Sequence, residues 1–471
     1  MRVLLSDIPL PQESKFGPFK RLGSAYPPIN LLYLGTQLSK AGHPTRITTD
    51  DYSLDEIRAV IREFNPDVIG VTYMTLGSAY LDDFVSMVNA EAPRAWLIAG
   101  GYHASLFPEE TLRRHPKILA VFKGEAERTI VPFMKILESG SPDVSSLREA
   151  HGIYFRDGDS IAATGPAPAI ENLDELPFPE FGLIPDYFSK YHSAVNRHYL
   201  GAPQAFLLTG RGCPFSCHFC GRMIMGRAIR QNSVDYRIEL IQWLRDRYQI
   251  KSIVYGDEFL TLNKKESVRF CERLRQQGLD KIEWCCCGRV SNMDYDFARE
   301  LHASGCRQIG YGCESGSQKV LDIINKRQKV ARMSAAIRDA HRAGLQVHGT
   351  FMLGCPGETQ DTIEETRRFI LSNPFGFVVL CFFTPLPGSY FWEQDRFLQY
   401  GTFANSDVSQ FNLFSGIPFV PHGLSEHDLR TARNRIYREF YLRPSRMARE
   451  LKYVFNANSW RFAARVAGFV S

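Results

Sequence analysis

The chain has no cysteine before Cys213, although the 471-residue sequence contains eleven. Thiols placed this unevenly in a chain of this length do not fit the disulfide framework of a small secreted protein. The first residues, Met1–Asp7, are typical of a strand and include no charged-then-apolar signal segment. The sequence therefore predicts a reduced, cytoplasmic setting.

Two further absences narrow the class of protein. No run approaches the ~18 apolar residues of a membrane span. No block of basic residues accompanies the formal charge of +5, so nucleic acid is not expected as a partner. The hydrophobic share of 44% and the charged share of 23% are those of a globular protein. A chain of 471 residues has the length of about two or three domains.

Residues 1–140 alternate short apolar runs with segments of helical periodicity. The runs lie near 3–5, 46–48, 68–71, 96–99 and 118–121, and the helical segments near 29–41, 54–63, 78–91 and 125–138. This order predicts a five-stranded, doubly wound (Rossmann-like) α/β domain. Ligands of such sheets bind beyond the carboxyl ends of the strands, which here are followed by Thr72-Tyr73-Met74, Gly100-Gly101-Tyr102-His103 and Gly124-Glu125. The paired glycines fit a close approach to a ligand and a simple tight turn equally well.

Residues 141–203 interrupt this periodicity with glycine and proline. Asp157-Gly158-Asp159 predicts the turn of a short hairpin, and Gly165-Pro166 with Pro177 predicts an extended connector. We interpret the segment as a linker between two domains.

Residues 204–390 contain six further strand candidates, which alternate with helical segments. The strands are expected at 206–210, 252–255, 282–287, 308–313, 347–353 and 377–383, and the helices at 233–247, 263–277, 293–304, 329–343 and 359–371. Six repeats are too few for an eightfold barrel, so the pattern predicts a partial (β/α)6 barrel. The active sites of such folds lie at the carboxyl ends of the strands.

Polar and charged residues follow several of these strands. They are Gly256-Asp257-Glu258, Arg289, Glu314-Ser315 and Glu358. Each has an ordinary explanation as a turn residue or a surface charge. Their shared position at one edge of the sheet favours a functional site.

Three cysteines follow the first strand of this second unit. Cys213, Cys217 and Cys220 have the spacing C-x3-C-x2-C within a loop that contains glycine and proline. A cubic iron–sulfur cluster normally takes four thiolates, so this loop would leave one iron open to a ligand that is not protein. A structural zinc site is the alternative, but zinc needs a fourth protein ligand, and no second pair of ligands follows nearby.

With Phe219 as its aromatic residue, the loop resembles the C-x3-C-x-aromatic-C loop of radical S-adenosylmethionine (SAM) enzymes. Gly310–Gly316 and Thr350–Thr359 resemble later strand motifs of the same family. The resemblance implies a [4Fe-4S] cluster whose open iron chelates SAM and whose electron cleaves SAM to a 5′-deoxyadenosyl radical. It also implies an external low-potential electron donor of the flavodoxin or ferredoxin type.

The first unit resembles the cobalamin-binding domain that precedes the radical domain in a large subfamily. The resemblance rests on Tyr26-Pro27-Pro28, Gly100–Ser105 and Gly124–Glu127. The D-x-H-x-x-G loop, which supplies a histidine to cobalt in many such domains, is missing, because residues 8–25 contain no histidine. The implied cobalamin contacts are Thr72, Tyr73, Met74, Gly100, Gly101, Tyr102, His103, Gly124 and Glu125, with His43 and His103 read as ordinary loop residues rather than cobalt ligands.

The resemblance also implies the contacts of SAM. It places Asp257, Glu258 and Glu314 near the amino group or the ribose, and Arg289 within reach of the methionine carboxylate. Phe219, Gly256 and Ser315 complete the expected set.

Regular alternation along the strand near 284–289 would place Cys285, Cys287 and Arg289 on one face. Cys285 or Cys287 is then a candidate for a hydrogen-atom donor or a ligand of a second cluster. Simple core packing is the ordinary alternative.

The function implied is methylation of an unactivated carbon of a natural product or lipid-like substrate. One SAM methylates cobalamin, a second yields the radical, and the substrate radical collects the methyl group. The rival within the same architecture is ring formation, ring contraction or oxidation without net methyl transfer. A non-catalytic cobalamin carrier or sensor belongs to another class, and it leaves the three-cysteine loop unexplained.

Residues 391–471 are expected to form a mainly helical region. Ser425 and Asp428 mark the start of a helix that runs through Phe440. Beyond Pro444, basic residues alternate with apolar and aromatic ones. This tail fits peripheral contact with an anionic membrane, and it also fits a helix docked on its own protein.

Overall fold

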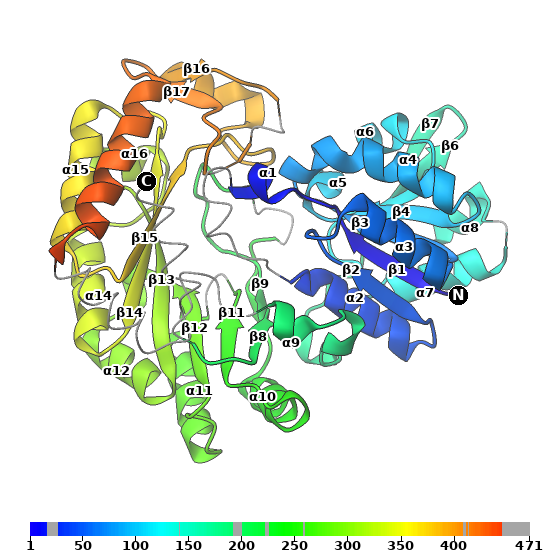
Figure 1. Cartoon of the computed structure of the whole chain (residues 1–471), viewed down its shortest axis with the longest axis horizontal. Coiled ribbons are helices and arrows are strands. Elements are labelled where there is room, and N and C mark those ends of the chain that lie inside the picture. Colours follow the sequence, from blue (N-terminus) through cyan, green and yellow to red (C-terminus); the bar gives the residue numbers. More distant parts are fainter. Residues whose placement is uncertain are drawn as a thin grey trace.

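The computed structural model describes residues 1–16, 27–140, 142–191, 200–221, 226–257, 260–407, 411–412 and 414–444. Two large sheets lie side by side in the molecule, and each is accompanied by its own helices (Figure 1).

The first sheet contains seven strands in the order β2-β1-β3-β4-β5-β6-β7. The first five strands of the chain run parallel, which confirms the doubly wound prediction. The sequence predicts the β6–β7 hairpin within a linker, but β6 pairs antiparallel with β5 and so extends the first sheet. The strands are β1 (Val3–Asp7), β2 (Thr45–Thr48), β3 (Val68–Thr72), β4 (Trp96–Gly100), β5 (Ile118–Phe122), β6 (Ile153–Asp157) and β7 (Ser160–Ala163).

Helices cover both faces of this sheet because successive strand residues bury on opposite sides. Leu4 and Ile69 pack in one apolar cluster with α3 and α4, whereas Leu5 and Ile98 pack in the other with α2 and α7. The helices are α1 (Gln12–Phe16), α2 (Ile29–Lys40), α3 (Leu54–Phe64), α4 (Leu81–Glu91), α5 (Tyr102–Leu106), α6 (Pro108–Arg114), α7 (Ile130–Glu138) and α8 (Val144–Glu149).

The second sheet contains six parallel strands in the order β15-β14-β13-β12-β11-β8. This arrangement confirms the partial barrel. Its strands are β8 (Gln204–Leu207), β11 (Ser252–Tyr255), β12 (Glu283–Gly288), β13 (Cys306–Glu314), β14 (Gln346–Leu353) and β15 (Phe377–Phe382). Its helices are α10 (Val234–Tyr248), α11 (Lys264–Gln276), α12 (Tyr295–Ala303), α13 (Gln318–Ile323), α14 (Val330–Arg342) and α15 (Gln360–Ser372). Figure 1 shows α10, α11, α12, α14 and α15 along the outer side of the sheet.

The connector between the sheets is packed rather than loose. Phe181 is 1% exposed, and its ring meets that of Tyr187, in α9 (Tyr187–Lys190), edge-on at 4.6 Å between centroids. The connector belongs to an apolar cluster that continues from one face of the first sheet into the second unit. The two units therefore share a core.

Tyrosine hydroxyls form hydrogen bonds with backbone groups at both edges of the partial barrel. At β15, the Tyr437 hydroxyl accepts a hydrogen bond from Leu380 N at 2.9 Å, and the Tyr441 hydroxyl donates one to Val378 O at 2.9 Å. At β8, the Tyr187 hydroxyl accepts one from Phe206 N at 3.1 Å. These contacts satisfy backbone groups that an edge strand would otherwise expose.

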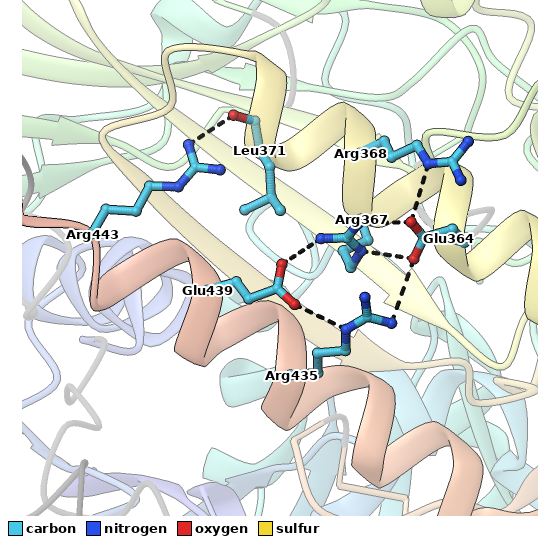
Figure 2. A network of polar contacts seen from close by, with 7 residues as sticks. All are labelled: Glu364, Arg367, Arg368, Leu371, Arg435, Glu439 and Arg443. Carbon is cyan, nitrogen blue, oxygen red and sulfur yellow. Dashed lines mark hydrogen bonds and ion pairs between the residues drawn. The ribbon is translucent and has the colours of Figure 1, made fainter.

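The helix that carries Tyr437 and Tyr441 is α16 (Glu426–Tyr441), which begins at the predicted Ser425–Asp428 capping box. Arginines hold it against α15 (Figure 2). Arg367 bonds both Glu364 and Glu439, at 2.7 Å for the Nη2–Oε1 pair with Glu364. Arg435 of α16 bridges the same two glutamates.

The rest of the described C-terminal region comprises the 3-10 segment η8 (Glu393–Tyr400) and the hairpin β16 (Gly401–Phe403) and β17 (Phe419–Pro421). The basic tail beyond Pro444 lies outside the described residues. Within the part of the chain that the structure describes, no helix is long and apolar enough to cross a membrane.

A candidate active site between the two sheets

An apolar cavity of about 380 Å³ lies between the carboxyl ends of the first sheet and the start of the cysteine loop. It brings the two groups of predicted residues together. The first sheet contributes Thr72, Met74, Gly100, Gly101, Tyr102, Gly124 and Glu125, and the second unit contributes Arg211, Gly212, Cys213 and Gly256. The position matches the switch point of a doubly wound sheet, where strand order reverses between β1 and β3.

Two predicted cobalamin contacts, Tyr73 and His103, do not line this cavity. Tyr73 is buried on the other side of the strand end, and its hydroxyl lies 3.0 Å from Thr111 Oγ1. The His103 ring packs against Tyr73 and Phe107, with centroids at 5.7 and 4.8 Å. Burial lowers the pKa of His103 to about 4, which keeps the ring neutral. Both side chains therefore pack outside the cavity, and their predicted contact with cobalamin stays a prediction.

Two glycines shape the wall of the cavity where a flat ligand would approach the backbone. At Gly101, with φ +89°, a Cβ atom would lie 2.2 Å from Thr72 Oγ1. At Gly124, with φ +81°, no described atom lies within 4 Å of such a Cβ. The close packing at Gly101 therefore reflects its contact with the end of β3, whereas the open space beside Gly124 leaves room for a ligand close to the backbone.

The cysteine loop is held by residues distant in sequence. Cys213 N donates to Gly226 O at 3.3 Å, which closes the loop on itself. Asn325 Nδ2 donates to Ser216 O at 2.8 Å, and His218 N donates to Ile324 O at 2.9 Å. The segment after α13 thus anchors the loop from outside.

The three cysteines of the loop are half-buried, and none of the eleven cysteines, all of which lie within the described residues, forms a disulfide. Among the described residues, no three His, Cys, Asp or Glu side chains converge on the position of one ion. A cubic cluster instead distributes its thiolates over separate irons. The donor set of three thiols on one loop fits a cluster with one open iron.

Asp257 fixes the start of this loop. Its carboxylate accepts hydrogen bonds from Thr209 N at 2.6 Å, from Thr209 Oγ1 at 2.8 Å and from Gly210 N. Burial raises the pKa of Asp257 to about 6, against the lowering effect of these hydrogen bonds. Its neighbour Glu258, also predicted to contact SAM, lies outside the described residues.

Arg289 lies against the cysteine loop. Its guanidinium carbon is 3.6 Å from the centroid of the Phe215 ring, and Nη2 donates to Lys326 O at 2.5 Å. The Cys217 thiol is also a partner of this guanidinium. The contact with SAM carboxylate predicted for Arg289 stays a prediction, and the structure adds a role in supporting the loop.

Glu314 forms a buried ion pair that the sequence did not predict. Lys326 Nζ lies 2.7 Å from Glu314 Oε1 and 5.6 Å from the centroid of the Phe219 ring. Ser315 is also buried, with its hydroxyl 3.0 Å from Thr366 Oγ1 of α15. Lys326 therefore lies close to both Phe219 and Glu314, two of the residues that are predicted to contact SAM.

The cysteines of β12 alternate as predicted. Cys286 packs with Trp284 in the large core, whereas Cys285 packs with Val254 in a separate small cluster. Cys287 is exposed, so core packing does not account for it. Its catalytic role stays a prediction.

Glu358 makes a pH-dependent contribution to stability. It is buried, accepts hydrogen bonds from Gly354 N and Cys355 N, and has a pKa raised by burial to about 8. The folded chain therefore holds a proton that the unfolded chain releases above about pH 4.5, so stability decreases as the pH rises from 4.5 to 8. This group alone gives a slope of up to about 1.4 kcal/mol per pH unit.

We expect Glu358→Gln to flatten that slope, because the amide has no proton to lose. Thermal unfolding midpoints of both proteins at pH 5 to 8 check this. Asp7, whose pKa burial also raises to about 8, leaves part of the slope in the variant. An equal loss of stability at every pH would contradict the assignment.

A doubly wound sheet and a partial barrel that carries three thiols, both opening on one cavity, define the class of a cobalamin-dependent radical SAM enzyme. Family comparison agrees: the B12 binding domain matches residues 19–133, and the Radical SAM superfamily matches residues 207–370. An uncharacterized methyltransferase of Pyrococcus horikoshii is 30% identical over 436 residues, which cover 91% of each chain. The chain belongs to this family, and its cofactors are a [4Fe-4S] cluster, SAM and cobalamin.

Two further relatives show the range of the family. The anaerobic magnesium-protoporphyrin IX monomethyl ester cyclase of Cereibacter sphaeroides is 28% identical over 429 residues, which cover 90% of this chain and 68% of the cyclase. The structure of the radical SAM methyltransferase TsrM of Kitasatospora setae, with tryptophan and a SAM analogue bound, has the same fold. Its TM-score is 0.69 at 15% identity, with 94% of this chain and 89% of TsrM covered.

Proposed function

We propose that the protein methylates an unactivated carbon of a natural product or lipid-like substrate. The observation that carries this proposal is a cavity lined by both Gly100-Gly101 and Cys213, because methyl transfer to such a carbon needs the cobalt and the radical source near one substrate. When bound, the cluster with SAM supplies a carbon radical and cobalamin supplies a methyl carrier. The relatives named as methyltransferases support the same activity.

The proposed work of the chain itself is binding and exclusion. Thr72, Met74, Gly100, Gly101, Tyr102, Gly124 and Glu125 would hold cobalamin; Phe219, Gly256, Asp257, Glu258, Arg289, Glu314 and Ser315 would hold SAM. The mostly apolar lining would limit the access of water to the radical. A low-potential donor of the flavodoxin or ferredoxin type would deliver the electron.

Methyl-labelled SAM tests the reaction. The reduced, reconstituted enzyme is incubated with a small-molecule and lipid extract of its source cells, and products heavier by one labelled methyl group are sought by mass spectrometry. Formation of 5′-deoxyadenosine without any labelled product would contradict methyl transfer. That outcome would favour ring formation, ring contraction or oxidation, for which the similarity to the magnesium-protoporphyrin cyclase is the supporting observation.

Gly124→Ala tests the place proposed for cobalamin. The added methyl group meets no described atom, so folding bears only the left-handed strain of about 1–2 kcal/mol, whereas a cofactor in that space would be displaced. We expect hydroxocobalamin to bind at least about tenfold more weakly, the equivalent of one methyl-sized clash of about 1.4 kcal/mol. Gly42→Ala is the matched control, because Gly42 has φ +89°, has no described atom near its Cβ position and lies outside the cavity. Equal affinity in both variants would contradict the placement.

A further inference from the structure

Four charged side chains meet in the space between the two cofactor sites. Arg211 and Arg230 belong to the second unit, and Glu125 and Glu127 follow β5 of the first sheet. Their side chains are only 7–15% exposed. Buried charges of this kind are costly unless each is paired, so the arrangement of the four residues needs an explanation.

The two arginines form the base of the hairpin that frames the cysteine loop. Arg211, in β9 (Gly210–Arg211), is the direct cross-strand partner of Arg230, in β10 (Arg230–Gln231). All three loop cysteines lie between them in sequence. Like charges directly opposite each other destabilise a strand pair, so this hairpin base requires negative charge from elsewhere.

The glutamates of the first sheet supply that charge. Arg211 Nη2 donates to Glu127 Oε1 at 2.5 Å, and Arg211 Nη1 lies 3.3 Å from Glu125 Oε2. Arg230 Nη1 donates to Glu125 Oε2 at 2.9 Å. Two cations are thus balanced by two anions across the boundary between the sheets.

The same residues also line the cavity. Glu125, Glu127 and Arg211 border it directly, beside Gly124 on one side and Cys213 on the other. Tyr33 of α2 makes a second contact between the two units. Its hydroxyl donates to Leu208 O at 2.9 Å, and its ring centroid lies 5.9 Å from the Arg211 guanidinium carbon. A displacement of the hairpin base would therefore move one wall of the cavity.

We propose that Arg211 is a positioning residue which, held by Glu127 and Glu125, couples cobalamin binding to assembly of the iron–sulfur cluster. The inference rests on the proposed placement of cobalamin in the cavity. Cluster assembly fixes the loop and with it Arg211, and Arg211 fixes the glutamates beside the corrin site. By linkage, each cofactor then increases the affinity for the other by the same factor.

The test compares cobalamin affinity in two states of the full chain. Hydroxocobalamin binding is measured by anaerobic equilibrium dialysis, with cobalt counted by mass spectrometry, before and after reconstitution of the cluster with iron and sulfide. For the wild type we expect an affinity about tenfold higher with the cluster, within the usual range of couplings between sites. We call the affinity with the cluster divided by the affinity without it the coupling ratio. In Glu127→Gln and Arg211→Gln this ratio should fall to within about twofold of one.

A purely structural role would weaken binding in both states and leave the ratio unchanged. Arg211→Lys keeps the charge but cannot bridge two carboxylates with a planar fork, so it should restore the ratio only in part. Arg128→Gln is the matched control, because Arg128 neighbours Glu127 but forms an exposed ion pair with Glu175, and it should keep the wild-type ratio.

A wild-type ratio of one, or a wild-type ratio in folded Glu127→Gln, would overturn the proposal. The assay requires no substrate, so failure of methyl transfer leaves its result intact. If cobalamin bound neither with nor without the cluster, the proposed placement of cobalamin in the cavity would be refuted instead.

Discussion

A Cys217→Ala variant is expected to lose its iron–sulfur cluster and to form no 5′-deoxyadenosine above background. Cys217 is one of the three thiols on the loop, so its loss leaves the cluster with two of them. Mutation of a residue that only hydrogen-bonds a metal ligand already lowers metal affinity or activity about 10–100-fold. Loss of a direct ligand should therefore lower both by more than about 100-fold. Iron content, the visible spectrum and chromatography of SAM cleavage products measure the effect.

Cys271→Ala is the control for this prediction. Cys271 is buried in α11, away from the loop, so its loss should lower the melting temperature and leave bound iron unchanged.

Replacing Cys213, Cys217 and Cys220 together addresses the second-cluster idea for Cys285 and Cys287. Complete loss of iron in that variant would exclude a second cluster.

A Gly212→Ala variant should lose both stability and cluster. Gly212 precedes Cys213 and has φ +84°, and a Cβ atom there would lie 2.0 Å from the backbone oxygen of Ala228. A backbone clash cannot be relieved by rotating a side chain, so the hairpin must open. Left-handed strain of about 1–2 kcal/mol and overpacking of about 1–3 kcal/mol add to roughly 3 kcal/mol. Thermal unfolding and iron content measure the two losses.

Gly226→Ala provides the comparison within the same loop. Gly226 also has a left-handed backbone, with φ +75°, but no described atom lies within 4 Å of its Cβ position. It should lose about 1–2 kcal/mol from strain alone and retain its iron. If both variants behaved alike, the close approach of Gly212 to Ala228 would not be what shapes the loop.

Much of the fold could be predicted because strands and helices alternate with clear periodicity. The exceptions follow from contacts that periodicity does not contain. The β6–β7 hairpin shows a local turn at Gly158, but nothing local indicates that its partner is β5. Helices α5 and α6 were missed because they are short, and they directly follow Gly101 and Phe107.

The residues of the site could be predicted where they belong to a local sequence motif. They could not be predicted where the site depends on contacts between residues that are distant in sequence. Cys213, Gly100 and Gly124 stood out by spacing or by glycine content. Lys326 and Asn325 did not, because each finds its partner only once the segment after α13 folds over the loop. Arg211 offered one signal, its position directly before Gly212-Cys213, but its glutamate partners lie more than 80 residues earlier.

The tyrosine contacts at the edges of the barrel bear on how the chain is made. The β8 edge is covered by Tyr187, which leaves the ribosome before the strand that it covers, whereas the β15 edge waits for Tyr437 and Tyr441 in α16. At about 5–20 residues per second, β15 remains uncovered on the ribosome for several seconds. During that time the nascent chain already has the tyrosine that bonds the β8 edge, whereas backbone groups of β15 are still accessible to a neighbouring chain.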